Sequence, residues 1–141
     1  MNLLRLVLAA LAAFVAYMGA GALVFGLIPS LRSEFLKYPA VYRDQSGQMS
    51  HMPIGMIGIF ISILSLAALY TLIYQGGSGL AEGARFGTLI GAFVIGAFTI
   101  HNYVNLNIGL KLTLQQSFAY FFEWLIVGLV IGLIYQPSIP Q

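Results

Sequence analysis

Glu123 is the side chain whose type and position most strongly suggest chemistry. It lies about ten residues into an apolar segment that begins near Thr113, hence roughly 15 Å along a helix that rises 1.5 Å per residue. An acid at such a depth in a bilayer is costly and is by default a candidate functional group. A low-dielectric surrounding favours the neutral carboxyl. Glu123 is therefore expected to be a proton or cation site, a protonated group that hydrogen-bonds between helices, or a group that contacts another subunit or a lipid.

Two further polar residues share a helical face with Glu123. Gln116 and Tyr120 precede it at the spacing i, i+4, i+7, which places all three side chains on one side of a helix. Thr113 extends this stripe to the end of the segment, so a polar path from the membrane edge to the middle is expected. Possible partners at a similar depth on other helices are Tyr17, Ser62 and Ser65.

Two histidines offer a different chemistry. His51 precedes one apolar segment and His101 lies near the end of another, and both are expected at the same side of the membrane. Neutral imidazole is a common metal ligand, so the pair could bind a haem iron, and either one alone the magnesium of a chlorophyll. The alternative is that both are interfacial histidines that hydrogen-bond to nearby polar groups. The sequence requires no cofactor, and it predicts no dedicated metal site.

No set of residues predicts catalysis. The chain has no cysteine, which excludes a thiolate nucleophile. The glycine-rich turn at 76–79 follows no predicted strand and precedes no Gly-Lys-Ser/Thr motif, so it does not predict a phosphate-binding loop. A non-enzymatic protein is therefore expected.

The composition indicates that membrane-spanning helices position these groups. Of 141 residues, 60% are hydrophobic and 7% are charged, and the mean hydropathy is +0.91. Soluble domains carry about 25% charged residues, so this chain could not cover a soluble globule with polar surface. Apolar segments long enough to cross a bilayer are expected at 3–28, 53–74, 82–104 and 113–135.

These segments predict an all-α fold, a four-helix transmembrane bundle in up-down order within one domain. The first apolar segment exceeds the core of about 7–15 residues found in signal peptides, so a retained span is expected. The polar segment 29–52 is expected to be a connecting loop, with a short amphipathic helix at 30–38 as the alternative. The tetrapeptide LIYQ at 72–75 recurs at 133–136, which would fit two duplicated helical hairpins.

In the third span Gly83, Gly87 and Gly91 recur every four residues, and Ala92 and Gly96 continue the small-residue pattern at the same spacing. The fourth span contains Gly128 and Gly132, again four residues apart. In lipid, residues without a bulky side chain let helix backbones approach closely. These positions are therefore expected to pack helices together: Gly83, Gly87, Gly91, Gly96, Gly128 and Gly132.

Three stretches resemble small bacterial four-span membrane proteins of unknown function, namely AEGARFGTLIG, NYVNLNIG and GLVIGLIYQP within residues 53–137. The resemblance implies a fold and a membrane location, and it transfers no functional residues. Small multidrug exporters also have four spans and one membrane glutamate, which lies in their first span. Here the first span has no acid and Glu123 is in the fourth, so that family is not indicated.

The leading functional hypothesis is a non-enzymatic membrane subunit that packs as a homo-oligomer or within a larger membrane complex. The alternatives are a small proton- or cation-coupled transporter or channel using Glu123, and a haem- or chlorophyll-binding subunit using His101 or His51. The expected partners are the lipid bilayer and other membrane subunits or further copies of the chain, without nucleic acid. The expected location is the bacterial inner membrane.

Overall fold

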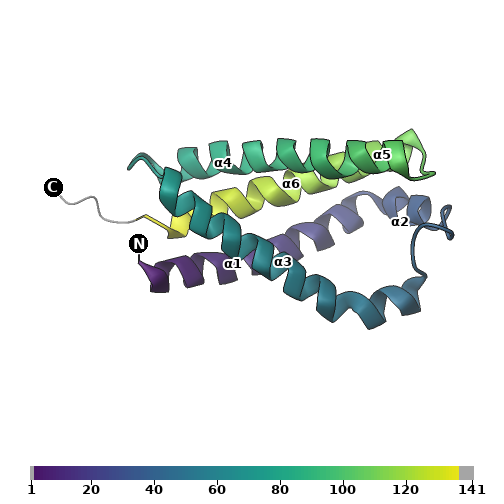
Figure 1. Ribbon diagram of the computed structural model, residues 1–141, viewed down its shortest axis with the longest axis horizontal. Coiled ribbons are helices and arrows are strands. Elements are labelled where there is room, and N and C mark those ends of the chain that lie inside the picture. The colour runs from purple at the N-terminus through teal and green to yellow at the C-terminus, as the bar shows by residue number, and fades with distance from the viewer. Residues whose placement is uncertain (1, 137–141) are drawn as a thin grey trace.

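A computed structural model describes residues 2–136, and these residues form helices joined by short connections (Figure 1). Four helical rods make up most of the fold, and a short helix joins the first two. The third rod is continuous from Gly79 to Asn105 and includes a π-helical segment, η1. The elements are α1 (Leu3–Leu27), α2 (Pro29–Phe35), α3 (Gln45–Ile73), α4 (Gly79–Val94), η1 (Ile95–Ile100), α5 (His101–Asn105) and α6 (Leu110–Ile134).

The four rods are long and apolar enough to cross a bilayer, and they run in alternating directions (Figure 1). The start of α1 and the end of α6 lie at the same end of the bundle, where the Arg5 guanidinium donates a hydrogen bond to the carbonyl oxygen of Gln136. The rings of Tyr70 at the end of α3 and Tyr135 after α6 also meet there, with centroids 6.4 Å apart. The predicted all-α, up-down four-helix bundle is thereby confirmed. The predicted duplication stays a prediction.

The contact between α4 and α6 is the most extensive in the bundle and is made largely by glycines. Gly83, Gly87 and Gly91 of α4 are buried against α6. A Cβ atom on Gly87 would lie 2.8 Å from the carbonyl oxygen of Leu125, so the two backbones are in direct contact. Gly128 and Gly132 of α6 complete the same interface. Five of the six expected packing glycines therefore lie at this one contact.

Gly96 differs from the other five glycines. It lies in η1, is exposed, and has no neighbouring atom within 4 Å of the position of a Cβ atom. Gly96 follows Gly91 by five residues rather than four, so it lies outside the register of the other glycines on the rod.

Helix α3 contacts the bundle mainly through its C-terminal half. Its buried residues, Ile63, Ala67 and Tyr70, belong to the same core cluster as the alanine face of α1. The N-terminal half diverges from α1 (Figure 1) and exposes most of its side chains. α3 begins at Gln45. The sequence pattern had predicted that this helix starts later, at Pro53. The earlier start is stabilised by Asp44, whose Oδ1 accepts a hydrogen bond from the Gly47 amide at 2.8 Å.

The segment 29–44 is not a simple polar loop, because the alternative expectation of a short helix at 30–38 is met by α2, which packs onto the start of α6. α2 buries Leu31 in a second core cluster with Val24 and Leu112. The Tyr38 hydroxyl accepts a hydrogen bond from the Gly109 amide at 2.9 Å. Apolar side chains spaced along this polar segment therefore give it a packed face, which closes one end of the bundle.

Candidate intramembrane site

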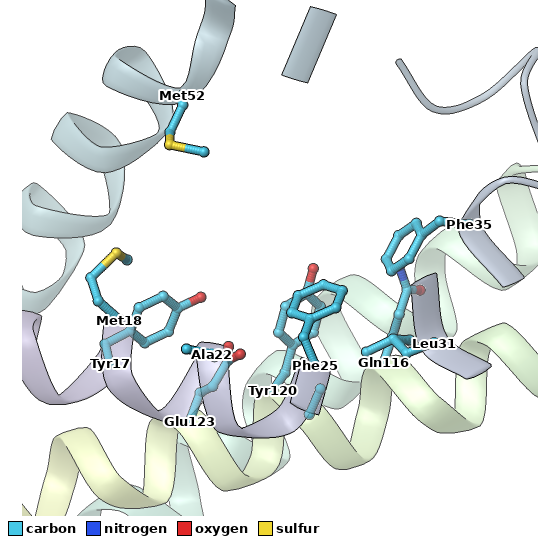
Figure 2. A pocket seen from close by; sticks show the side chains of 12 residues that line it. Tyr17, Met18, Ala22, Phe25, Leu31, Phe35, Met52, Gln116, Tyr120 and Glu123 are labelled. Atoms are coloured by element: carbon cyan, nitrogen blue, oxygen red, sulfur yellow. The ribbon is translucent and has the colours of Figure 1, made fainter. Parts of the chain in front are cut away.

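A cavity of about 420 Å³ lies between α1, α6, α2 and the diverging half of α3 (Figure 2). Most of its lining is apolar. Its polar lining residues are Tyr17 of α1 and the α6 residues Gln116, Tyr120 and Glu123. The predicted stripe on α6 thus faces one cavity, and Tyr17 is the predicted partner that joins it.

The carboxyl of Glu123 points from α6 toward α1 (Figure 2). Glu123 is only 6% exposed, because α6 is the central helix and packs against both α1 and α4. A Cβ atom on Gly21 would lie 3.3 Å from Glu123 Oε1, so this glycine makes room for the carboxyl. The Tyr17 phenol lies beside the same carboxyl (Figure 2). Within residues 2–136, Glu123 Oε2 is buried without a hydrogen-bond partner.

Gln116 forms the other polar end of the cavity. It is 5% exposed, and its Nε2 donates a 3.2 Å hydrogen bond to the hydroxyl of Tyr42. Among the described residues, its Oε1 is buried without a partner. Buried polar atoms are nearly always satisfied by protein, water or ligand. Two unsatisfied acceptors on one cavity wall therefore indicate a site that takes water or a ligand.

The expected polar path from Thr113 to Glu123 does not form. The Thr113 hydroxyl donates back to the Gly109 carbonyl at 3.2 Å, and Leu31 and Phe35 of α2 line the cavity at that end. The lining residues of high exposure lie instead on α1 and α3, with Phe25 50% exposed and Met52 53% exposed. The cavity therefore opens sideways between α1 and α3.

Ser62 and Ser65 are not partners of Glu123. Their hydroxyls donate to the carbonyls of Gly58 and Ile61, four residues earlier on α3. Both serines line a second, mostly apolar cavity of about 700 Å³ between α3 and the α4–η1–α5 rod. The sequence predicts how deep Ser62 and Ser65 lie along their helix. It does not predict which neighbouring helix their side chains face.

The π-helical segment η1 forms part of the wall of this second cavity through Phe98. Its Thr99 hydroxyl donates to the Ile95 carbonyl at 2.8 Å and accepts a 3.0 Å hydrogen bond from Ser117 of α6. This polar contact joins η1 to α6. No residue pattern in the sequence indicated a π-helix here.

Glu34 holds α2 over the closed end of the cavity. It is 3% exposed, and its Oε1 lies 2.7 Å from the ammonium groups of both Lys37 and Lys111. Hydrogen bonds from Lys111 and then Lys37 hold the pKa of Glu34 below its ordinary value. Lys111 lies in the first turn of α6, so Glu34 and its two lysines connect α2 to the helix that carries the polar stripe.

We expect acid to loosen α2. Because the pKa of Glu34 is lower in the folded protein, its stabilising effect is complete above the ordinary pKa of about 4.3. The effect is lost as the pH falls through the lowered folded-state pKa. Hydrogen exchange at residues 31–36, corrected for intrinsic rates, should therefore stay slow at pH 5–7 and accelerate below about pH 4. Glu34→Gln should exchange fast already at pH 7, and an unchanged profile in that variant would contradict the role of Glu34.

The two histidines are not brought together. His51 lies on the exposed first half of α3 and His101 on α5, and these helix segments lie at opposite edges of the bundle (Figure 1). His51 Nδ1 lies 2.8 Å from the Gly47 carbonyl oxygen and 2.9 Å from the Ser50 hydroxyl. This placement does not support a haem ligated by both residues. Ligation of a single pigment by one of them stays a prediction.

Four apolar rods suggest an integral membrane protein, and its most distinctive internal feature is the sideways-opening cavity at Glu123. No protein-family model, curated protein or solved structure matches the chain. A function is therefore inferred from this cavity.

Proposed function

We propose that the chain is a small membrane transporter that exchanges a proton for a cation at Glu123. The observation that carries this proposal is the carboxyl of Glu123. The residue is 6% exposed and lines the cavity, and its Oε2 has no hydrogen-bond partner within residues 2–136. A structural glutamate would be expected to use both oxygens in bonds between helices. This one retains free acceptor capacity beside an open volume.

The exchange follows from the cost of a buried charge. The ionised carboxyl is expensive in an apolar cavity unless a cation accompanies it. The salt bridges found within residues 2–136 join Glu34 to two lysines outside the cavity and provide no such cation for Glu123. A proton or an incoming cation can therefore neutralise Glu123, and each excludes the other. Competition of this kind couples proton movement to cation movement.

Glu123→Gln should abolish the coupled flux. Glutamine keeps the shape of the neutral acid but can neither release a proton nor balance a cation. In proteoliposomes containing a pH-sensitive dye, an imposed gradient of Na⁺, K⁺ or an organic cation should drive proton movement with the wild type and not with this variant.

Glu82→Gln is the matched control, because Glu82 lies outside the cavity and accepts hydrogen bonds from the Gln75 and Gly77 amides. It should retain the flux. Equal proton movement with wild type and Glu123→Gln would contradict the proposal.

A second candidate function is that of a membrane subunit packed against copies of itself or a larger complex, for instance in a bacterial inner membrane. It is favoured by the first half of α3, which projects from the bundle and exposes Ile54 and Ile57 to 71% and 60%. The glycine faces give the subunit function less support, since five of those glycines are buried in the contact between α4 and α6.

Disulfide crosslinking tests this second function directly, because the chain contains no cysteine. If the first half of α3 contacts a second copy, oxidation of Ile57→Cys in native membranes should give a dimer of about twice the 15.3 kDa chain mass. Leu72→Cys is the control, since Leu72 is 80% exposed at the other end of the same helix. A purely monomeric Ile57→Cys protein would exclude self-association through this half of α3.

A further inference from the structure

We infer that the cavity at Glu123 binds a lipophilic organic cation that carries aromatic or bulky apolar groups and enters sideways from the bilayer between α1 and α3. This inference rests on the proposed function and specifies its substrate class. Three properties of the cavity lead to it, namely the charge balance at Glu123, the distance between the polar groups, and the aromatic lining.

The charge balance requires a cation. The titratable groups that line the cavity with Glu123 are the phenols of Tyr17 on α1 and Tyr120 on α6. The elements α2 and α3 contribute Leu31, Phe35 and Met52 to the lining, which carry no charge. An ionised Glu123 would therefore be a single negative charge in an apolar cavity, and a ligand with one positive charge complements it.

The spacing of the polar groups argues against a bare metal ion. Glu123 and Gln116 carry the unsatisfied acceptor oxygens of this cavity wall. They are seven residues apart on α6, and at 1.5 Å per residue their positions differ by about 10 Å along the helix axis. A hard cation such as Ca²⁺ takes about 6–8 oxygen ligands at about 2.3–2.6 Å, so these groups cannot surround one ion. A larger ligand can place its charge at Glu123 and a polar group near Gln116.

The lining suits the apolar part of such a ligand. Phe25, Phe35, Tyr17 and Tyr120 surround the volume together with two methionines (Figure 2). Aromatic faces attract organic cations, and methionine side chains adapt to irregular apolar shapes. A volume of about 420 Å³ lies within the range of about 300–1,000 Å³ that is usual for small-molecule sites.

The route by which a ligand would enter the cavity also favours a lipophilic ligand. Phe25 on α1 and Met52 on α3 lie at the exposed mouth of the cavity, and the cavity is lined by α2 at the end toward Gln116. A ligand that partitions into the bilayer reaches this mouth without crossing a polar surface. A strongly hydrated ion would first have to lose its water in lipid.

Tetraphenylphosphonium is the probe for this inference, with purified full-length protein in lipid nanodiscs. The wild type should bind it at one site, more tightly at pH 8 than at pH 5, and release protons in weak buffer as it binds. Glu123→Gln should weaken binding at least tenfold and release no protons. Phe25→Leu should weaken binding about 2- to 30-fold, as expected for the loss of one cation–π contact. Because Phe25 is half exposed, this variant tests the site even if Glu123→Gln fails to fold.

Neutral triphenylphosphine oxide is the matched ligand control and should bind far more weakly. The inference is wrong if the wild type does not bind tetraphenylphosphonium, if Glu123→Gln binds it equally, or if the neutral probe binds as tightly. Should the phosphonium fail to bind while Na⁺ or K⁺ gradients still drive Glu123-dependent proton flux, the substrate class is wrong and the proposed function stands. Should Glu123-dependent proton flux and proton release both be absent, the proposed function itself fails.

Discussion

Replacing Gly87 with leucine is expected to destabilise the bundle by about 3 kcal/mol, since overpacking a core costs about 1–3 kcal/mol and sometimes more. A Cβ atom on Gly87 would lie 2.8 Å from the Leu125 carbonyl oxygen and 2.9 Å from the Leu125 Cα atom. These are backbone atoms, which cannot move away by changing a rotamer. The whole of α6 must shift, and this would also disturb the contact of α6 with α1.

The measurement is the thermal unfolding midpoint in a mild detergent, followed by circular dichroism and by size-exclusion chromatography after heating. Gly96→Leu is the matched control, because the same substitution in the same rod meets no atom within 4 Å at its Cβ position. It should change the free energy of unfolding by less than about 0.5 kcal/mol, as is usual for exposed positions. Equal losses in the two variants would mean that the α4–α6 contact is not the tight interface that stabilises the fold.

The overall fold was predictable because each span is a long apolar segment with polar residues at its ends. The pairing of α4 with α6 was not predictable, although both glycine repeats were visible. A small-residue face shows that a backbone can approach closely, but it does not identify the partner helix. Gly96 was included with the others because it lies four residues after Ala92, but it follows Gly91 by five residues and so falls outside the register of the glycine face.

The candidate site was predictable along one helix and less so between helices. The spacing of Gln116, Tyr120 and Glu123 fixes their common face, because helical geometry is local. The room beside Gly21 and the approach of Met52 depend on how α1 and α3 cross, which the sequence pattern does not specify. A short amphipathic helix at 30–38 was an alternative expectation, and its apolar residues Leu31 and Phe35 do pack in the second core cluster. That this helix closes the cavity was not predictable, because the pattern of one helix does not identify what its apolar face contacts.

The arrangement of the helices changes the balance between the two functional hypotheses. Small-residue faces left unpacked within the bundle would support the hypothesis of a membrane subunit. In the structure, five of the six glycines are used inside the bundle, so these faces do not call for a partner. Glu123 keeps an unsatisfied oxygen among the described residues, so the group that the transporter hypothesis needs is still available. The cavity therefore supports transport more strongly than the glycine repeats support assembly.

Replacing Gly21 with leucine should block the cavity while keeping the Glu123 carboxyl group in the protein. Gly21 lines the cavity, and a Cβ atom there would already lie 3.3 Å from Glu123 Oε1. The remaining carbon atoms of leucine would cover the carboxyl and fill the volume in front of it. We expect tetraphenylphosphonium binding to fall at least tenfold and cation-driven proton flux in proteoliposomes to disappear.

Gly19→Leu is the matched control for this last change. Gly19 lies on the same helix, is exposed, and has no atom within 4 Å of its Cβ position. The Gly19→Leu variant should bind the phosphonium as the wild type does, and both variants should elute as folded protein in size-exclusion chromatography.

If Gly21→Leu folds and still binds and transports normally, the ligand does not reach Glu123 through this cavity. If Gly19→Leu loses binding as well, added bulk anywhere on α1 is harmful, and the effect at Gly21 would say nothing specific about the carboxyl. Function is tied to the space between α1 and Glu123 only if Gly21→Leu loses phosphonium binding and proton flux while Gly19→Leu retains both.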